Sequence, residues 1–410
     1  MYFKLNSYAY IVPSNSKGCI YDLKSGKVYT VSKELCDQII SLEQNTQIEE
    51  TGVDRTELDK LVKLELGDYY EHNICVDKIR YGCSRNMKNM MFQKNRIYSL
   101  FLQIENICNM DCSFCDEVSY NRVTGCRKYS DKKLVSIDQY KKILFDAKKL
   151  GCISLSLLGG EPLLQKELVK EILKYAEYLE YKEIYLYTNA FLLDEKFIVE
   201  NKNIYYVIQS VAIQQEMLNQ IDNNRNNLNN FMHVLQILRD NDAKFILYLA
   251  LTEKNYRLKE EMRNFYEPYK PTKILYKYIY QETKDKEFNK LLVCDPFNED
   301  MRIDDKQFFH NLDKHPCLFG KFTVFLNGDI GVCPMMRENI ISNIFEESLS
   351  QVLIEKKQEK YWYLAVDQIE KCGQCSMRYA CFDCRAIEAF KTGNLYKKYY
   401  CNICSGNDNE

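Results

Sequence analysis

The first hydrophobic segments of the chain are short and have the composition of β-strands. They lie at Tyr8 to Val12, Cys19 to Leu23 and Val28 to Val31, and a turn containing Gly26 predicts that the last two form a hairpin. After Ser32, a typical helix-capping residue, apolar residues recur with the helical period. Residues 1–88 are therefore predicted to form a winged-helix-like domain, and a cap that only completes the protein core is the alternative interpretation.

From about Tyr98 the pattern changes to strands that alternate with helices. The strand-like runs are Leu100 to Ile104, Ile153 to Leu158, Ile184 to Tyr187, Tyr206 to Ile208, Phe245 to Leu251 and Ile274 to Ile279. Helical patterns between them include Ile137 to Leu150, Lys166 to Leu179 and Asn229 to Arg239. Six such units predict an α/β fold over residues 97–290, with a parallel sheet that is open or curved into a partial (β/α)6 TIM-like barrel.

Beyond Cys294 the helical pattern fades. A strand pair is predicted at Lys321 to Leu326 and Ile330 to Cys333, around Asn327-Gly328-Asp329, and a helix and a cysteine-dense tail follow. Residues 294–410 are therefore predicted to form a third, cysteine-rich domain.

Within the composition, the number of cysteines is the most informative feature for predicting the function. The 410 residues include 56 basic and 58 acidic side chains, and no apolar run approaches the roughly 20 residues of a spanning helix, so we expect no nucleic-acid and no membrane partner. The first residues lack the pattern of a signal peptide, so we expect a cytoplasmic protein. Because that compartment keeps thiols reduced, the 18 cysteines indicate metal or iron-sulfur ligation.

Three cysteines stand close together directly after the first strand of the predicted sheet. The segment reads Cys108-Asn-Met-Asp-Cys112-Ser-Phe-Cys115. Three thiolates on one loop suit three corners of a [4Fe-4S] cluster and leave the fourth iron open. Zinc is the alternative, although its usual pattern is two CxxC pairs.

This loop resembles the signature of the radical S-adenosylmethionine (radical SAM) enzymes, CxxxCxΦC, with Phe114 at the aromatic position. The resemblance implies that Cys108, Cys112 and Cys115 hold a [4Fe-4S] cluster whose open iron binds the amino and carboxylate groups of S-adenosylmethionine. Reduction by one electron, from a donor such as flavodoxin or ferredoxin, then cleaves the cofactor to a 5'-deoxyadenosyl radical. In such enzymes the cofactor supplies the difficult chemistry and the protein positions it.

Further segments match the same family. Gly159-Gly160-Glu161-Pro162 follows the second strand and resembles the family's GGEP segment, which implies that Glu161 binds the cofactor's amino group. Asn189, after the third strand, and Ser210, after the fourth, resemble weaker family positions. Each segment alone is also typical of an ordinary turn. The chain departs from the family at Ser210-Val211-Ala212, where relatives commonly carry Ser-x-Asp.

The tail repeats the CxxC spacing, at Cys372 and Cys375 and again at Cys381 and Cys384. One zinc ribbon needs four thiolates and is the simple interpretation. With the first loop, however, the tail resembles the SPASM extension, which carries two auxiliary [4Fe-4S] clusters and brings the total to three. That resemblance implies an outer set and an inner set of ligands, respectively Cys372, Cys375, Cys381 and Cys401, and Cys317, Cys333 and Cys384. The fourth inner ligand is left open between Cys294, Cys404 and an exchangeable substrate thiolate.

The combination resembles the radical SAM maturases of ribosomally made peptides. It implies a precursor peptide as partner, with its leader bound by a PqqD-like domain at residues 1–88, and a thioether or other cross-link as product. Two alternatives remain at this stage. One is a sulfatase-type formylglycine maturase, which does not call for a leader domain. The other is a non-catalytic iron-sulfur or zinc scaffold that binds a partner protein.

Overall fold

The computed structural model describes residues 1–80, 96–115, 135–281, 283–297 and 300–402. The chain divides into two compact units. The first comprises Met1–Gln93, Val293–Phe319 and Lys360–Glu410, and the second comprises Lys94–Leu292 and Gly320–Glu359. The contacts thus group the N-terminal residues with most of the tail, whereas the sequence-based bounds 1–88, 97–290 and 294–410 stay predictions.

The second unit is built on a mostly parallel sheet, as the sequence predicted. Its six parallel strands are β6 (Ser99–Glu105), β7 (Ser154–Gly159), β8 (Glu183–Thr188), β9 (Tyr205–Ser210), β10 (Lys244–Leu251) and β11 (Lys273–Tyr278), in spatial order β11-β10-β9-β8-β7-β6. β12 (Lys321–Val324) continues the sheet parallel to β6, and β13 (Asp329–Gly331) and β14 (Ser342–Asn343) follow antiparallel. Within the described residues the ladder is open at both ends, a partial barrel rather than a closed one.

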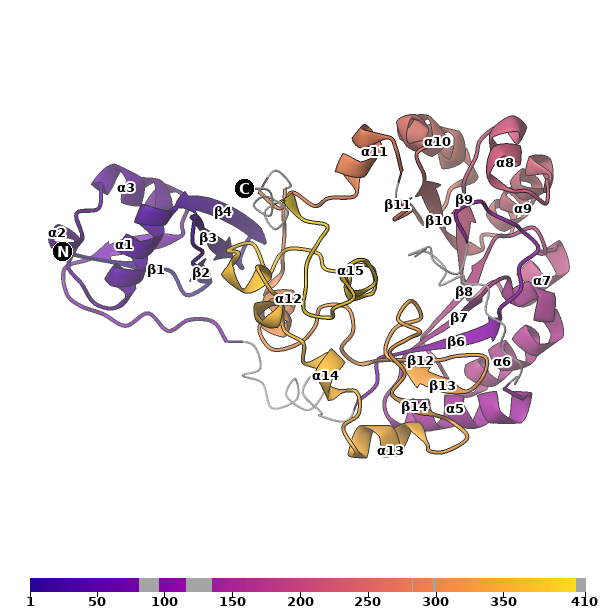
Figure 1. The fold of residues 1–410 in the computed structure, drawn as a ribbon. Coiled ribbons are helices and arrows are strands. Elements are labelled where there is room, and N and C mark those ends of the chain that lie inside the picture. The colour runs from indigo at the N-terminus through magenta and orange to yellow at the C-terminus, as the bar shows by residue number, and fades with distance from the viewer. Residues whose placement is uncertain (81–95, 116–134, 282, 298–299, 403–410) are drawn as a thin grey trace. The chain divides into compact units, whose positions relative to one another are not determined.

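Helices connect the parallel strands and lie outside the sheet in Figure 1. They are α5 (Ile137–Lys149), α6 (Lys166–Tyr178), α7 (Glu195–Glu200), α8 (Gln215–Ile221), α9 (Leu228–Asp240), α10 (Lys259–Tyr266) and α11 (Lys286–Leu291), with α13 (Leu349–Ile354) after β14. α6 shows why the pattern was readable, because its buried residues Val169, Ile172, Leu173 and Ala176 form one stripe. Every residue of β7 is buried, as expected for a strand covered on both faces.

The first unit begins with two small antiparallel sheets. β1 (Tyr2–Leu5) pairs with β5 (Gly67–Tyr70), while β2 (Ala9–Val12), β3 (Lys17–Asp22) and β4 (Lys27–Ser32) form a second sheet in that order. α1 (Lys33–Glu43), α2 (Ile48–Thr51) and α3 (Arg55–Lys63) follow. The predicted hairpin and cap are confirmed, since the Ser32 side chain accepts a hydrogen bond from Leu35 N.

β1 and β5 were not predicted, and Lys4 shows why. This residue interrupts the apolar pattern of a four-residue strand, yet it is only 3% exposed. Its Nζ donates to the carbonyl oxygen of Leu42 at 2.7 Å and to Asn45 Oδ1 at 2.9 Å, so the buried charge is satisfied at the end of α1. A long-range partner of this kind is invisible in a local pattern.

The tail adds α12 (Asp305–Asn311), α14 (Glu359–Trp362), α15 (Arg385–Thr392) and short 3-10 turns at Val366–Gln368 and Cys372–Gln374. It shares a hydrophobic core with the second N-terminal sheet. Val12, Cys19 and Tyr21 pack there with tail residues Ile303, Phe308, Val366, Ile369, Met377 and Tyr379. The Tyr21 hydroxyl also donates to Ser376 O at 2.8 Å. The N-terminal residues therefore complete the core of the tail, whatever else they bind.

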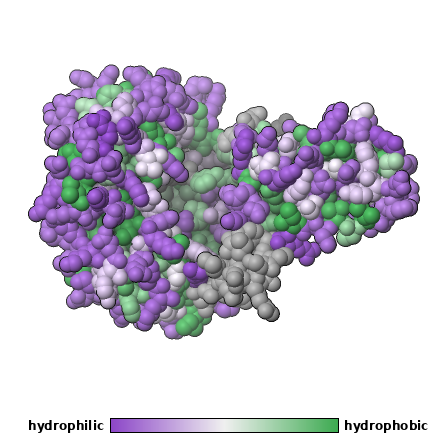
Figure 2. Space-filling model, turned by 180° about the vertical axis from the view of Figure 1, so that it is seen from behind, coloured by the Kyte–Doolittle hydropathy of each residue, from purple (hydrophilic) through white to green (hydrophobic). Residues whose placement is uncertain are grey.

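Hydrophilic residues dominate the face seen in Figure 2, and hydrophobic residues form small separate patches on it. None of the described helices is both long enough and apolar enough to cross a membrane.

Candidate active site at the cysteine loop

The cysteine loop leaves the C-terminal end of β6, the position expected for the working surface of a parallel sheet. Cys108, Cys112 and Cys115 are each partly buried, and Cys115 N donates to Cys112 O at 2.9 Å, which closes a tight turn. Phe114 lies inside this turn and is 1% exposed. Its aromatic ring thus fixes the loop by burial, which is the structural reason for an apolar residue between two ligand-type cysteines.

Gly159 and Gly160 bring the end of β7 against the backbone that enters this loop. Gly160 N donates to Glu105 O and Glu161 N donates to Ile107 O, both at 2.8 Å. A Cβ on Gly159 would lie 2.1 Å from Glu105 O, and a Cβ on Gly160 would lie 2.1 Å from Ile107 O. The missing Cβ atoms of the two glycines therefore allow a close approach to protein backbone.

Glu161 connects the ends of three strands. Its side chain is 0% exposed, and its oxygens accept hydrogen bonds from Thr188 Oγ1 at 2.9 Å, Asn189 N at 2.8 Å and Leu163 N at 3.0 Å. Burial raises the pKa of this carboxyl to about 7, although the hydrogen bonds from Asn189, Leu163 and Thr188 oppose the shift. At neutral pH the group is therefore poised between its two protonation states.

Asn189 links Glu161 to the cysteine loop by hydrogen bonds. Its Nδ2 donates to Cys108 Sγ at 3.4 Å and to Asn109 Oδ1 at 2.6 Å. Ser210 is different, because its buried hydroxyl lies 2.8 Å from the Tyr266 hydroxyl and 3.2 Å from Ala212 O. The structure thus brings Cys108, Glu161 and Asn189 together, and a cofactor contact at Ser210 stays a prediction.

A second support of the loop was not predicted from the sequence. Asp222, which is 0% exposed, accepts hydrogen bonds from Asp111 N at 2.8 Å and from Asn226 Nδ2 at 2.7 Å. Main-chain bonds run alongside, from Ser113 N to Ile221 O at 2.8 Å and from Asn223 N to Asp111 O at 3.1 Å. The loop is thus held by a short antiparallel pairing in which Cys112 faces Asp222.

Asparagine side chains complete this support. Asn224 Nδ2 and Asn226 Nδ2 both donate to Asn109 O, at 3.1 and 3.2 Å. The run Asn223-Asn224-Arg225-Asn226-Asn227 resembles an ordinary polar turn in the sequence. In the sequence, only Asp222 at the end of a helix with an apolar face could have indicated this support. Such an aspartate is too common to predict a site.

The three loop thiols fit an iron-sulfur cluster by their chemistry. Burial and then the neighbouring thiolates of Cys115 and Cys108 raise the pKa of Cys112 well above its usual value, and burial raises that of Cys108 to about 11. A bound cationic centre would remove this mutual repulsion. Among the residues that the structure describes, no three His, Cys, Asp or Glu side chains gather tightly enough for one metal ion. A cubane binds each thiolate to a different iron and so accepts a wider spacing.

The predicted outer ligand set lies within the first unit. Cys375 N donates to Cys372 O at 2.9 Å in a tight turn, and Cys401 is 4% exposed. Burial first, and then the charges of Cys372 and Cys401, raise the pKa of Cys375 to about 11. That these four thiols bind one cluster stays a prediction.

The predicted inner set is divided between the units. Cys317 and Cys384 belong to the first unit and Cys333 to the second, so this ligand set stays a prediction. Cys404, considered for its fourth position, lies outside the described residues.

A network of buried charged residues connects the cysteine segments of the tail. This network was not predicted from the sequence. Asp383 accepts from Lys398 Nζ at 3.0 Å and forms an ion pair with Arg385, while His315 Nε2 lies 3.4 Å from its carboxylate. The other nitrogen, His315 Nδ1, accepts from Cys317 N at 3.0 Å. Although burial opposes the shift, the charge of Lys398, the hydrogen bond from His315 and the charge of Arg385 hold the pKa of Asp383 well below its usual range. The network thus fixes Cys317 relative to the segment between Cys381 and Cys384.

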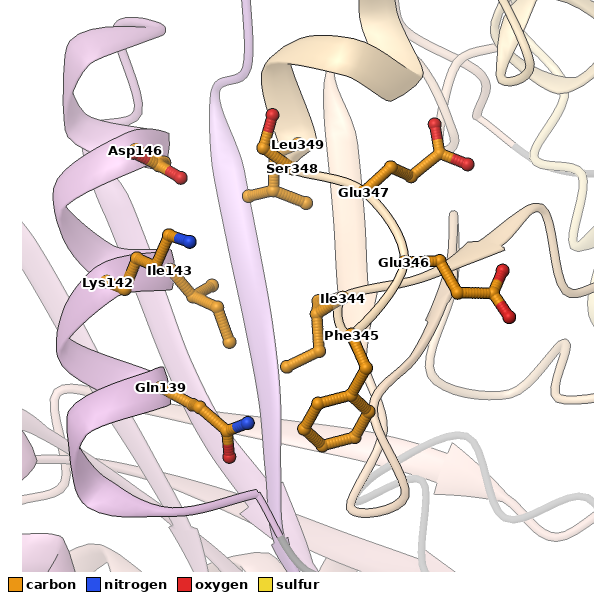
Figure 3. A pocket seen from close by; sticks show the side chains of 10 residues that line it. All are labelled: Gln139, Lys142, Ile143, Asp146, Ile344, Phe345, Glu346, Glu347, Ser348 and Leu349. Atoms are coloured by element: carbon orange, nitrogen blue, oxygen red, sulfur yellow. The ribbon is translucent and has the colours of Figure 1, made fainter.

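A pocket of about 330 Å³ lies away from these cysteines, between α5 and the segment from Ile344 to Leu349 (Figure 3). Lys142, Ile143 and Phe345 are among its lining residues. Glu347, also in the lining, pairs with Lys357. None of the candidate ligand or cofactor-binding residues named from the sequence lines this pocket.

Residues 102–265 match the model of the Radical SAM superfamily. Among solved structures, Streptococcus suis SuiB bound to S-adenosylmethionine has a TM-score of 0.56 at 15% identity, covering 98% of this chain and 99% of that one. SuiB bound to the precursor peptide SuiA has a TM-score of 0.59 at 16% identity, covering 98% and 100%. The structure of tagged anSMEcpe with bound AdoMet has a TM-score of 0.55 at 17% identity, covering 74% and 93%. A search of curated proteins found no match.

The match covers the sheet from β6 to α10 and includes the cysteine loop, Gly159-Gly160-Glu161, Asn189 and Asp222. The resemblance read from the loop is thus confirmed for this part of the chain. At these identities the structural likenesses show the fold, and the SPASM extension and the leader-recognition domain stay predictions.

Proposed function

We propose that the protein is a radical SAM enzyme that modifies a ribosomally made precursor peptide, because residues 102–265 match the Radical SAM superfamily model. The observation that carries the proposal is the cysteine loop at the C-terminal end of β6, bonded to Asn189 and Asp222. Cys108, Cys112 and Cys115 would hold a [4Fe-4S] cluster, which supplies one-electron cleavage of S-adenosylmethionine when bound.

The protein's own part is to position the cofactor. Glu161 is the candidate partner of the cofactor's ammonium group, because a buried carboxylate that is ionised stabilises a cation strongly. Gly159 and Gly160 hold Glu161 beside the loop through the bonds to Glu105 and Ile107. Thr188 and Asn189 orient the carboxylate through their own hydrogen bonds.

The affinity for S-adenosylmethionine is expected to depend on pH through Glu161. Only the ionised carboxylate attracts an ammonium group, and its pKa without the cofactor is about 7. Lowering the pH from 8 to 6 takes the group from mostly ionised to mostly protonated and should weaken binding about tenfold. Equilibrium dialysis on the reconstituted protein measures this, with Glu161→Gln as the control that binds weakly at both pH values. An equal pH dependence in Glu161→Gln would assign the effect to another group.

Asp222 is proposed as a positioning residue of the cluster loop. Asp222→Asn keeps the size of the side chain but replaces one accepting oxygen with a donor, which opposes either the bond from Asp111 N to Oδ1 or the bond from Asn226 Nδ2 to Oδ2. We expect iron to leave the loop cluster about tenfold faster in the presence of a chelator, from a loss of about 1.4 kcal/mol. Asp240→Asn, on the exposed face of α9, is the control. Equal acceleration of iron loss from the tail would indicate general destabilisation and contradict a positioning role.

The N-terminal sheet is the proposed site for the precursor's leader. β4 is the end strand of the order β2-β3-β4, and an end strand pairs readily with an added peptide strand. SuiB was crystallised with its precursor peptide SuiA, and the match to SuiB covers 98% of this chain, against 74% for anSMEcpe. The match to a peptide-bound structure over nearly the whole chain supports a peptide as substrate.

We expect saturating precursor to slow amide exchange in β4, because new main-chain hydrogen bonds protect its edge. Hydrogen exchange read by mass spectrometry over Lys27–Ser32 tests this, and the edge strand β11 (Lys273–Tyr278) serves as the control. Protection of β11 with no change in β4 would place the peptide elsewhere.

The decisive test of the function is the product. The enzyme is co-expressed with the peptide encoded beside its gene, and the peptide is analysed by mass spectrometry. A thioether or other cross-link removes two hydrogens and leaves a new bond that fragmentation locates. A peptide that is unchanged with active, reduced enzyme would contradict the proposed substrate class. Supplying flavodoxin or ferredoxin in place of dithionite tests the proposed electron donor.

A further inference from the structure

Cys294 lies beside a member of the outer ligand set. Its Sγ is 3.9 Å from Cys381 Sγ, and both residues belong to the first unit. The backbone fixes this position, since Cys294 N donates to Tyr400 O at 3.2 Å and Asn402 N donates to Cys294 O at 3.1 Å. Cys294 is thereby paired across a parallel bridge with Cys401, another member of the outer set.

The separation of the two sulfur atoms indicates whether one metal could be bound by either of them. Two thiolates bound to one tetrahedral metal at about 2.3 Å lie about 3.8 Å apart. The 3.9 Å between Cys294 and Cys381 is close to this distance, so an iron bound by one sulfur atom would be within reach of the other. An iron of a [4Fe-4S] cluster takes one cysteine, because the cluster's sulfides occupy its other positions. Only one of the two thiolates can therefore bind at a time.

A buried cation lies near Cys381, because Lys398 Nζ is 3.5 Å from the carbonyl oxygen of Phe382. Lys398 is buried beside Asp383 and Glu388, with side-chain exposures of 4%, 5% and 3%, at 3.0 and 3.2 Å from their oxygens. Cys294 and Cys381 thus lie side by side near a fixed cation, close enough for one iron to bind either sulfur atom.

We propose that Cys294 and Cys381 are interchangeable ligands of one iron in the outer auxiliary cluster. The inference rests on the proposed function, which supplies that cluster, and it assigns Cys294 to the outer set. The iron then keeps a protein thiolate when either cysteine is lost or oxidised. The fourth position of the inner cluster falls to Cys404 or to an external ligand such as a substrate thiolate.

Iron content of the full chain tests this, in a background where Cys108, Cys112 and Cys115 are replaced by Ala. We expect about 8 irons per chain in this background. Cys294→Ala and Cys381→Ala should each keep about 8, and the double variant should fall to about 4. Cys372→Ala, which removes an outer ligand without a substitute, should also fall to about 4. Cys152→Ala, at a buried cysteine outside the proposed ligand sets, controls for loss of a thiol.

The outcomes separate the inference from the function on which it rests. A fall to about 4 irons in Cys381→Ala alone, with the same fall in Cys372→Ala, overturns interchangeability but keeps the outer cluster. Zinc in place of iron, or iron unchanged in Cys372→Ala and in the double variant, overturns the outer cluster itself. Circular dichroism identifies a double variant that fails to fold, and the two single variants then decide.

Alkylation gives a second measurement that needs no substitution. Iodoacetamide applied to the folded, loaded protein should label Cys294 and Cys381 to a combined extent of about one per chain, because one of them is always bound. Peptide mapping by mass spectrometry measures the sum. Two labels per chain would overturn the inference. It would also be overturned if neither residue were labelled in the loaded protein but both were labelled after the clusters had been removed.

Discussion

Replacing Cys108, Cys112 and Cys115 with Ala is expected to abolish the cleavage of S-adenosylmethionine to 5'-deoxyadenosine. The three thiols leave the C-terminal end of β6, and Cys108 is the one that Asn189 contacts. Without them the proposed catalytic cluster has no protein ligands, and the rate should fall by about three orders of magnitude or more. The measurement is chromatography of 5'-deoxyadenosine after anaerobic reconstitution and reduction with dithionite.

The iron content and a matched control variant test whether the loss of cleavage comes from the loss of the loop cluster. Iron should fall from about 12 to about 8 per chain, because the proposed auxiliary clusters have other ligands. Cys152→Ala is the control, since Cys152 is fully buried just before β7 and bonds to Ser154 O and Tyr98 O. It should keep both iron and cleavage. Undiminished cleavage in the triple variant would remove the loop from the reaction and contradict the proposed function.

The sheet was predictable because its signal is local. β10 (Lys244–Leu251) contains an unbroken apolar run, Phe245 to Leu251, and such a run in a chain of alternating elements indicates a strand. The capping box at Ser136 and Gln139 starts α5 at the predicted residue. Where pattern and capping agree, the sequence determines the element without knowledge of its neighbours.

The rest of the fold depends on contacts between distant residues. In one hydrophobic core Tyr21 packs against Phe308 and Tyr379, which lie more than 280 residues further along the chain. The local sequence of each segment gives no indication of its partner. Lys4 looks exposed in the sequence and is buried because carbonyl oxygens of α1 receive it. Such partners are set by the assembled fold.

The candidate site divides in the same way. The cysteine spacing and Gly159-Gly160-Glu161 were readable, because a cluster and a close backbone approach each demand particular residues at particular intervals. Asp222 was not, since its carboxylate meets Asp111 N across more than 100 residues. The sequence thus identifies the groups that would hold a cofactor better than the groups that hold them in place.

Gly160→Ala is expected to cost the enzyme its loop cluster and its activity, although the change adds one methyl group. The new Cβ would lie 2.1 Å from Ile107 O and 2.5 Å from Ile107 C, and both are backbone atoms that no side-chain rotation can move away. Relief requires the entry to the cysteine loop to shift, which would break the 2.8 Å bond from Glu161 N to Ile107 O. Overpacking of this kind costs about 1–3 kcal/mol.

The damage should be concentrated at the site, because Gly160 adjoins Glu161 and contacts the residue before Cys108. We expect cleavage of S-adenosylmethionine to fall about 100-fold and about 4 irons per chain to be lost, because the strain displaces both the cluster ligands and the cofactor's carboxylate partner. Gly52→Ala is the matched control, since Gly52 has φ +66° but nothing within 4 Å of its added Cβ. It should lose about 1 kcal/mol of local stability from backbone strain and keep cleavage intact. Full activity in Gly160→Ala would show that the loop tolerates displacement, and the coupling between β7 and the cysteine loop would then have no part in positioning the cofactor.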